Sequence, residues 1–121
     1  MAEGGDPWDM TKPEDLTRLF VERVNAGDVD GLVALYEPDA VIAFPPGRLT
    51  QGHAAIRALY EGMLAGKPHF EYEEPLTTLI AGDLALTATP AQDEAGVRAQ
   101  VVRRQSDGRW LRVLDRPDFT Q

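Results

Sequence analysis

The chain has 121 residues, with 20 acidic against 12 basic side chains, a formal net charge of −8 and no cysteine. This length predicts a single domain with its own core, and the missing cysteine excludes disulfides and thiolate chemistry. The acidic balance argues against binding to nucleic acid or to an anionic membrane surface. No apolar stretch approaches the roughly 20 residues of a membrane span, and the start lacks the basic and apolar regions of a secretory signal. We therefore expect a cytoplasmic protein.

The domain is expected to fill residues 11–121 without an internal repeat or a low-complexity tract. Residues 1–10 are interpreted as a flexible lead-in, in which Trp8 is a large apolar side chain.

Two helices are predicted directly after the lead-in. Thr11 to Glu14 fit a capping box with Pro early in the first turn. Apolar residues at helical spacing follow, until the stop signal at Asn25-Ala26-Gly27. Asp28 can cap a second, shorter helix whose apolar residues include Tyr36 and which ends before Pro38.

The rest of the chain is predicted to contain one more helix and then only strands. A short apolar strand covers residues 40–44, and a third helix begins near residue 52 and ends at Gly66-Lys67-Pro68. Strands are then predicted over 69–81 and 84–89, followed by a hairpin over 97–115. Helices first and an antiparallel meander afterwards indicate an α+β fold.

The last hairpin decides which polar side chains meet. Asp107-Gly108 is a strong signal for a two-residue turn, because a type I′ turn needs positive φ and Gly adopts it at little cost. Directly opposed residues of an antiparallel pair share a face, and counting outward from this turn gives the pairs Val102–Val113 and Gln100–Asp115. Arg98 lies on the same face, two residues further along. We therefore expect Arg98, Gln100 and Asp115 to form one cluster above the two valines.

The opposite face of the hairpin is mainly apolar, and we expect another part of the protein or a second copy to pack against it. It is predicted to carry Val97, Ala99, Val101, Trp110 and Leu114, with Arg103 and Arg112 among them.

The sequence predicts neither a metal site nor a cofactor site. His53 and His69 are isolated and lack the spacing of metal ligands. No G-x-G-x-x-G, Walker or G-x-S-x-G motif is present, which argues against nucleotide binding and serine hydrolase chemistry. The acidic run Glu71, Glu73 and Glu74 alternates in part with aromatic residues and predicts a solvated strand face.

Three segments in this order, LYEPDAVIAFPPG, QGHAAIRALY and DGRWLRVLD, resemble the nuclear transport factor 2-like superfamily, in particular its SnoaL-like polyketide-cyclase and ketosteroid-isomerase branches. The resemblance covers nearly the whole chain from residue 13. It implies an α+β, cystatin-like fold, in which a cone-shaped, curved antiparallel sheet wraps around three helices and leaves a deep, mostly apolar pocket. It also implies a homodimer through the outer face of the sheet.

Two mechanisms of that superfamily can be compared with this chain residue by residue. Ketosteroid isomerases use a carboxylate base and an oxyanion hole of Tyr and protonated Asp. The matching positions here are Phe44, Phe20 and Gln100, so the chain lacks the groups for that mechanism. Limonene-epoxide hydrolases have an Arg-x-Asp on one strand and an Asp on the last strand. Arg98 and Asp115 match this pattern, but Gln100 stands at the acid position and cannot deliver a proton.

Together, these features predict a protein that binds a small, largely apolar molecule bearing a carbonyl or similar acceptor, without cofactor or metal. As an enzyme it would be an isomerase, cyclase or hydrolase, with Asp115 as the base and with Arg98 and Gln100 orienting the ligand. Two alternatives stay open: a non-catalytic binding module on the same cone, and a homodimeric scaffold with a filled cone. The expected pocket walls are Phe20, Tyr36, Phe44, Tyr60, Leu64, Val102 and Val113.

Overall fold

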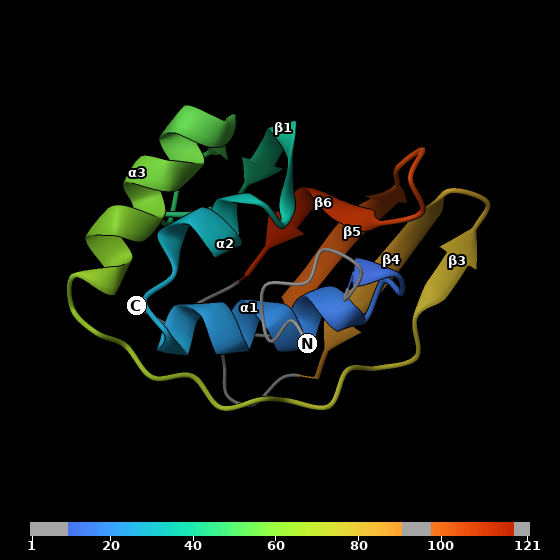
Figure 1. The fold of residues 1–121 in the computed structure, drawn as a ribbon, viewed down its shortest axis with the longest axis horizontal. Helices are drawn as coiled ribbons and strands as arrows, with labels where there is room; N and C mark the ends of the chain where they lie inside the picture. The colour runs from blue at the N-terminus through green and yellow to red at the C-terminus, as the bar shows by residue number, and fades with distance from the viewer. Residues whose placement is uncertain (1–9, 91–97, 118–121) are drawn as a thin grey trace.

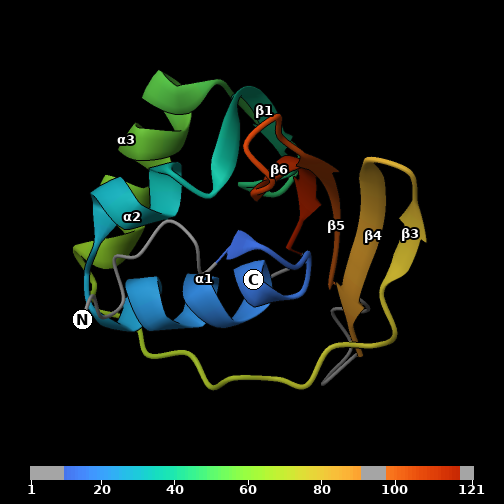
Figure 2. The ribbon, with the colours of Figure 1, turned by 45° about the vertical axis from the view of Figure 1, so that its right-hand side comes forward.

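The helices lie in the hollow of a curved sheet in the computed structural model, which describes residues 10–90 and 98–117 (Figure 1). Figure 2 shows the sheet bending around α1. The helices are α1 (Asp15–Asn25), α2 (Val29–Val33) and α3 (His53–Leu64). The strands are β1 (Tyr36–Ile42), β2 (Thr50–Gln51), β3 (Leu79–Ala81), β4 (Leu84–Thr89), β5 (Arg98–Arg104) and β6 (Trp110–Arg116). The expected α+β class is confirmed. Trp8 and Val97 lie outside the described residues.

The sheet is mixed, which corrects the expectation of a purely antiparallel one. Its strand order is β2-β1-β6-β5-β4-β3. The second and third strands in this order, β1 and β6, run parallel, while the other neighbours are antiparallel. A parallel neighbour needs a long connection, and here the whole chain between β1 and β6 supplies it.

None of the described helices is long and apolar enough to cross a membrane.

The first two helices differ from their predictions at their ends. The capping box of Thr11 and Glu14 does not form: α1 begins at Asp15, whose carboxylate accepts the Lys12 backbone N–H at 3.0 Å. The Asp28 cap is confirmed, because its side chain accepts the Gly31 backbone N–H at 2.9 Å. However, α2 ends at Val33, and Tyr36 starts β1. Tyr36 thereby lies opposite Arg112 of β6.

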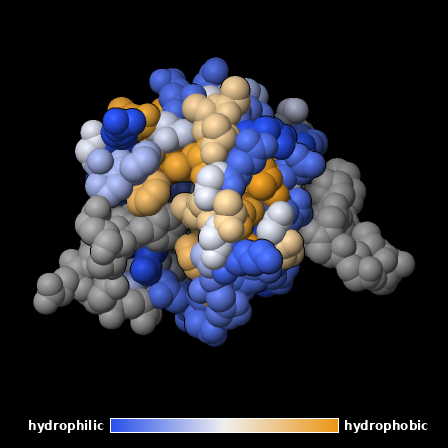
Figure 3. Space-filling view, turned by 90° about the vertical axis from the view of Figure 1, so that its left-hand side faces the viewer, coloured by the Kyte–Doolittle hydropathy of each residue, from blue (hydrophilic) through white to orange (hydrophobic). Residues whose placement is uncertain are grey.

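The core lies between the three helices and the concave face of the sheet. Its fully buried large side chains come from every one of these helices and from β1 and β5. They include Leu16, Leu19, Leu32, Ile42, Ile56 and Val102. On the side of α3, apolar side chains also reach the surface among hydrophilic ones (Figure 3). Leu59, Met63 and Leu64 of α3 are only partly buried.

The final hairpin has the predicted pairing at one end and a different one at the other. Gln100 lies opposite Asp115, as expected, but the register shifts by one residue between Val101 and Val102, so that Val102 lies opposite Arg112 instead of Val113. The turn is also longer than two residues, because Arg104 pairs with Trp110. A register shift of this kind is a β-bulge, in which one strand of a pair has one extra residue. The bulge at Val113 compensates for the longer turn and restores the Gln100–Asp115 pair.

This shift changes which side chains face outward. Arg112 and Trp110, expected on the outer face, are 3% and 5% exposed and point into the fold. Leu114, half exposed, does face outward, and so do Val101 and Ala99, which lie opposite outward-facing partners.

A long segment predicted as a strand has no regular structure. Residues 67–78, which we call the strap, run past α1 on the way from α3 to β3 (Figures 1 and 2), and only residues 79–81 of the predicted strand form one. Pro68 and Pro75 explain the difference, because proline has no N–H for a ladder. The side-chain amide of Asn25 holds the strap in place: it donates to the Phe70 carbonyl at 2.9 Å and accepts the Phe70 N–H at 2.8 Å.

Removing this amide should loosen the strap. We expect Asn25→Ala to lose both bonds, at about 1 kcal/mol each, and Asn25→Asp to keep only the acceptor. Limited proteolysis within residues 67–78 should therefore accelerate in the order wild type, Asn25→Asp, Asn25→Ala, while Glu22→Ala on the same helix serves as a control. Equal cleavage in all four proteins would contradict the anchoring role.

Candidate functional site

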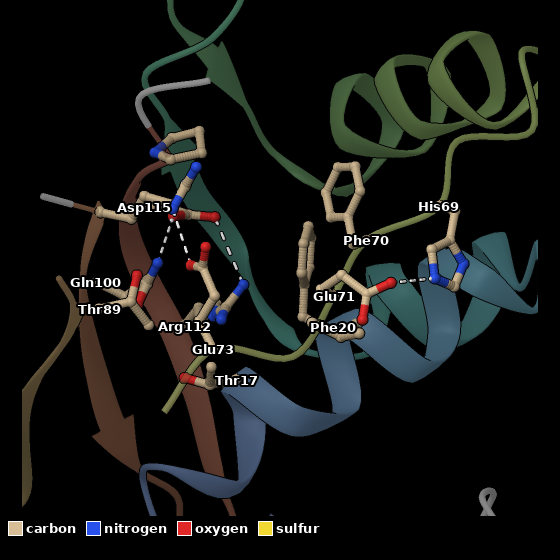
Figure 4. A pocket seen from close by; sticks show the side chains of 13 residues that line it. Thr17, Phe20, His69, Phe70, Glu71, Glu73, Thr89, Gln100, Arg112 and Asp115 are labelled. Atoms are coloured by element: carbon tan, nitrogen blue, oxygen red, sulfur yellow. Dashed lines mark hydrogen bonds and ion pairs between the residues drawn. The ribbon is translucent and has the colours of Figure 1, made fainter. Parts of the chain in front are cut away.

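A cavity of about 280 Å³ opens between α1, the strap and strands β4 to β6 (Figure 4). Its apolar lining residues are Phe20, Val21, Phe70 and Pro117. Its polar lining residues are Thr17, His69, Glu71, Glu73, Thr89, Arg98, Gln100, Arg112 and Asp115. The cavity is therefore amphipathic, with most of its polar atoms on the side of the sheet and aromatic rings on the side of α1 and the strap.

Asp115 lies at the floor of this cavity and is 5% exposed. Its Oδ2 accepts the Tyr36 hydroxyl at 2.7 Å, and its Oδ1 accepts Nε2 of Gln100 at 3.2 Å. The amide of Gln100 is itself fixed, because its Oε1 accepts the Thr87 hydroxyl at 2.8 Å. The predicted meeting of Gln100 and Asp115 thus occurs, and the carboxylate has a defined orientation.

Behind Asp115, two buried tyrosines form a chain of hydroxyl groups. The Tyr36 and Tyr60 oxygens are 2.7 Å apart, and since Tyr36 donates its only proton to Asp115, Tyr60 must donate to Tyr36. Burial, and then the nearby Asp115 carboxylate, raise the pKa of both hydroxyls well above the ordinary value. The tyrosines therefore stay protonated and act as donors toward the carboxylate.

Arg112 is the cation next to Asp115, and sequence reasoning missed it. Its Nη1 lies 3.6 Å from Oδ2 of Asp115 and 3.5 Å from the Tyr36 hydroxyl. Its guanidinium lies over the rings of Phe20 and Tyr36, at 5.2 and 5.9 Å from their centroids. Burial lowers the pKa of Arg112, but the Asp115 carboxylate and the Tyr36 side chain raise it more, so the net shift is upward. No sequence signal marked the bulge that turns this side chain inward.

Arg98, the cation expected beside Asp115, lies instead at the rim of the cavity. Its Nη1 is 2.8 Å from Oε1 of Glu73 on the strap. Glu73, predicted on a solvated face, is therefore turned toward the cavity, because the strap is not a strand. Glu71 also lines the cavity, but its side chain is exposed and accepts a hydrogen bond from His69 at 2.8 Å.

Comparison with known proteins identifies the family. The profile of the SnoaL-like domain matches residues 17–113. The chain belongs to the SnoaL-like family. The epoxide hydrolase LasB of Streptomyces lasalocidi is 31% identical over 106 residues, which make up 87% of this chain and 36% of that protein. The SnoaL-like chain thus spans about a third of the length of this relative.

Solved structures agree on the fold. A ketosteroid isomerase-like protein from Erwinia carotovora has a TM-score of 0.66 at 19% identity, with 89% of this chain and 93% of that one covered. A nuclear transport factor 2-like protein with a cystatin-like fold from Novosphingobium aromaticivorans has a TM-score of 0.67 at 21% identity, with 90% and 80% covered. The resemblance drawn from the short motifs is confirmed at the level of fold and family.

Of the expected pocket walls, only Phe20 lines the cavity of this SnoaL-like fold. Tyr36, Tyr60 and Val102 are buried at 2% exposure or less and support its floor from behind. Phe44, Leu64 and Val113 are partly buried elsewhere and are not among its lining residues. The aromatic wall comes instead from Phe70 of the strap. Within the described part of the chain, no three His, Asp or Glu side chains gather closely enough to hold a metal ion.

Tyr36 and Tyr60 should resist ionisation until the protein unfolds. Their pKa values are raised in the folded state above the value of about 10 expected when unfolded. The stability linked to them is therefore present below pH about 10 and is lost as the pH rises above it. The pKa of Tyr72 is raised too, by desolvation and by Glu74, but its side chain is 48% exposed.

A spectrophotometric pH titration tests this expectation. Tyrosinate absorbance should rise in two stages, first for Tyr72 and then for the two buried tyrosines together with the loss of circular dichroism. In the Tyr36→Phe/Tyr60→Phe double variant the second stage should vanish. Ionisation of all three tyrosines in a folded protein would contradict the buried chain of hydroxyls.

Proposed function

We propose that this SnoaL-like protein is a cofactor-independent enzyme that opens an epoxide ring, with Asp115 as the base. The observation that supports it is the position of Oδ1 of Asp115. Among the described residues, this oxygen accepts only the long 3.2 Å bond from Gln100, at the floor of an open cavity, and a carboxylate oxygen can accept a second donor. The hydroxyl of water, or of the substrate itself, can occupy that position. The partial relative named as an epoxide hydrolase agrees with this reaction.

In the proposed reaction, Asp115 takes the proton of the hydroxyl group. The hydroxyl oxygen then bonds to an epoxide carbon, the bond from that carbon to the ring oxygen breaks, and the ring oxygen gains a proton. A positioned carboxylate base of this kind typically contributes a rate factor of about 10² to 10⁴. Gln100 and Tyr36 hold the carboxylate, while Phe20 and Phe70 offer an apolar wall to the substrate.

The cavity also bears on the alternatives. An open volume of about 280 Å³ that contacts Asp115 does not agree with a scaffold whose cone is filled. It is near the lower end of the range for small-molecule sites, so the substrate would be small and largely apolar. A binding module on the same cone differs from the enzyme only in lacking turnover.

Asp115→Asn should separate these possibilities with styrene oxide as the probe in isotopically labelled water. We expect the wild type to accelerate diol formation and the variant to lose about a hundredfold or more of that acceleration, while binding of the neutral epoxide is kept. Asp30→Asn, at an exposed aspartate paired with Arg57, is the matched control. Binding without turnover in the wild type would favour the binding module, and full turnover in Asp115→Asn would refute the base.

We also propose that a second copy of the chain covers the outer face of the sheet. Directly opposed apolar residues form one row across five strands. The row is Leu79, Leu86, Val101, Leu114 and Val41. Exposed apolar surface of this kind marks an interface, and a row can pair with its own copy about a two-fold axis.

Introducing a charged side chain into this row should therefore convert the dimer into monomers. Leu86→Glu and Leu114→Glu are expected to lower the sedimentation coefficient without loss of fold, and Leu76→Glu on the strap is the control at similar exposure. Trp110, buried in the core, is unsuitable for this test. A wild type that sediments as a monomer would contradict the dimer.

A further inference from the structure

We propose that Arg112 binds the substrate oxygen that becomes negatively charged, so that the floor of the cavity is a base and an oxyanion site side by side. This inference rests on the proposed function of Asp115 and extends it. It assigns the electrophilic partner that the match to Arg98 and Gln100 left without a residue.

Arg112 has too few partners for a buried guanidinium. It is 3% exposed and carries five N–H donors. Among the described residues, its side chain makes one long hydrogen bond, 3.5 Å to the Tyr36 hydroxyl, and one long ion pair, 3.6 Å to Asp115. Its Nε has no hydrogen-bond partner. Charge-assisted bonds usually measure about 2.7 to 2.9 Å, so this guanidinium is held chiefly by packing between two rings and lacks a close acceptor.

The position of Arg112 supports the same role. Arg112 lines the same cavity as Asp115, and Figure 4 shows the two side chains converging from the same strand. When the acidic proton of a substrate lies at Asp115, the neighbouring substrate atoms therefore lie next to Arg112.

The charge of Arg112 needs a balancing anion throughout the reaction. Before the reaction, Arg112 is balanced by the Asp115 carboxylate. When Asp115 takes a proton it becomes neutral, and the buried cation needs a new anion. The ring oxygen that receives the electron pair of the broken carbon–oxygen bond is that anion, and it later takes the proton back, directly or through solvent. The total charge in the cavity stays constant at every step, and a low dielectric makes such a match strong.

The substrate class follows from this arrangement. The group that loses its proton and the oxygen that gains the charge must lie close together in one complex. Hydroxy-epoxides, and epoxides attacked by a bound water, meet this requirement. So do carbonyl compounds with an acidic neighbouring C–H, in which the oxygen of the enolate would carry the charge.

Binding of para-nitrophenol tests the inference without any turnover, because the phenol and the phenolate differ in absorbance. In the wild type, we expect the neutral phenol to bind and donate to Asp115. In Asp115→Asn, which imitates the protonated carboxyl, Arg112 has lost its anion, and the phenolate should bind about tenfold or more tightly than in the wild type. Asp115→Asn/Arg112→Gln should lose this gain, and Asp115→Asn/Arg112→Lys should keep part of it. Asp30→Asn should behave as the wild type.

The outcomes separate this inference from the proposed function. A folded Asp115→Asn protein that binds phenolate no better than the wild type overturns the role of Arg112, even where styrene oxide turnover has been lost and the base is supported. A gain of phenolate binding in a variant that still opens styrene oxide supports the oxyanion site and refutes Asp115 as the base. If Asp115→Asn/Arg112→Gln does not fold, the comparison of wild type, Asp115→Asn and Asp115→Asn/Arg112→Lys still decides whether Arg112 binds the phenolate.

Discussion

The one-residue bulge in β6 is the constraint on which the rest of the site depends. In a regular strand, residues three apart point to opposite faces, so Arg112 and Asp115 would be separated by the sheet. The bulge at Val113 lets both point to the concave face. Without it, a carboxylate would stand alone at the floor, and a cation would lie among the outer apolar row.

The ion pair that results is not explained by stability alone. Taking both charges out of water costs several kcal/mol, and well-packed apolar residues at such positions are often equally stable or more so. Tyr36 and Gln100 offset part of that cost by donating hydrogen bonds to Asp115, and Tyr60 by donating to Tyr36. Within residues 10–90 and 98–117, however, Nε of Arg112 has no hydrogen-bond partner. A fold that retains a buried, incompletely satisfied cation beside an open cavity has the features of a binding or reacting site.

The sequence predicts some parts of the fold and not others, and the reasons differ from residue to residue. The order of the three helices and of the longer strands and the end of α1 at Asn25 could be predicted, because they follow from periodicity and stop signals. The Gln100–Asp115 pair was predicted from a two-residue turn, and it occurs because the longer turn and the bulge at Val113 offset each other. Arg112 could not be predicted, because a bulge leaves no local pattern and simple alternation from a two-residue turn assigns it outward. The strap was missed for a different reason: partial alternation over residues 69–78 looked like a strand, although Pro75 within it has no N–H for a ladder. The loss of that strand also explains why Phe70 and Glu73, not Phe44 or Leu64, line the cavity.

The alternation along β5 and β6 links the two sides of the sheet. Gln100 and Asp115 point inward, while their chain neighbours Val101 and Leu114 point outward and form part of the apolar row. The spacing of two peptide backbones therefore sets both the contact between amide and carboxylate and the shape of the exterior. Val101 and Leu114 on the exterior therefore share their backbone with the amide and the carboxylate that meet on the interior.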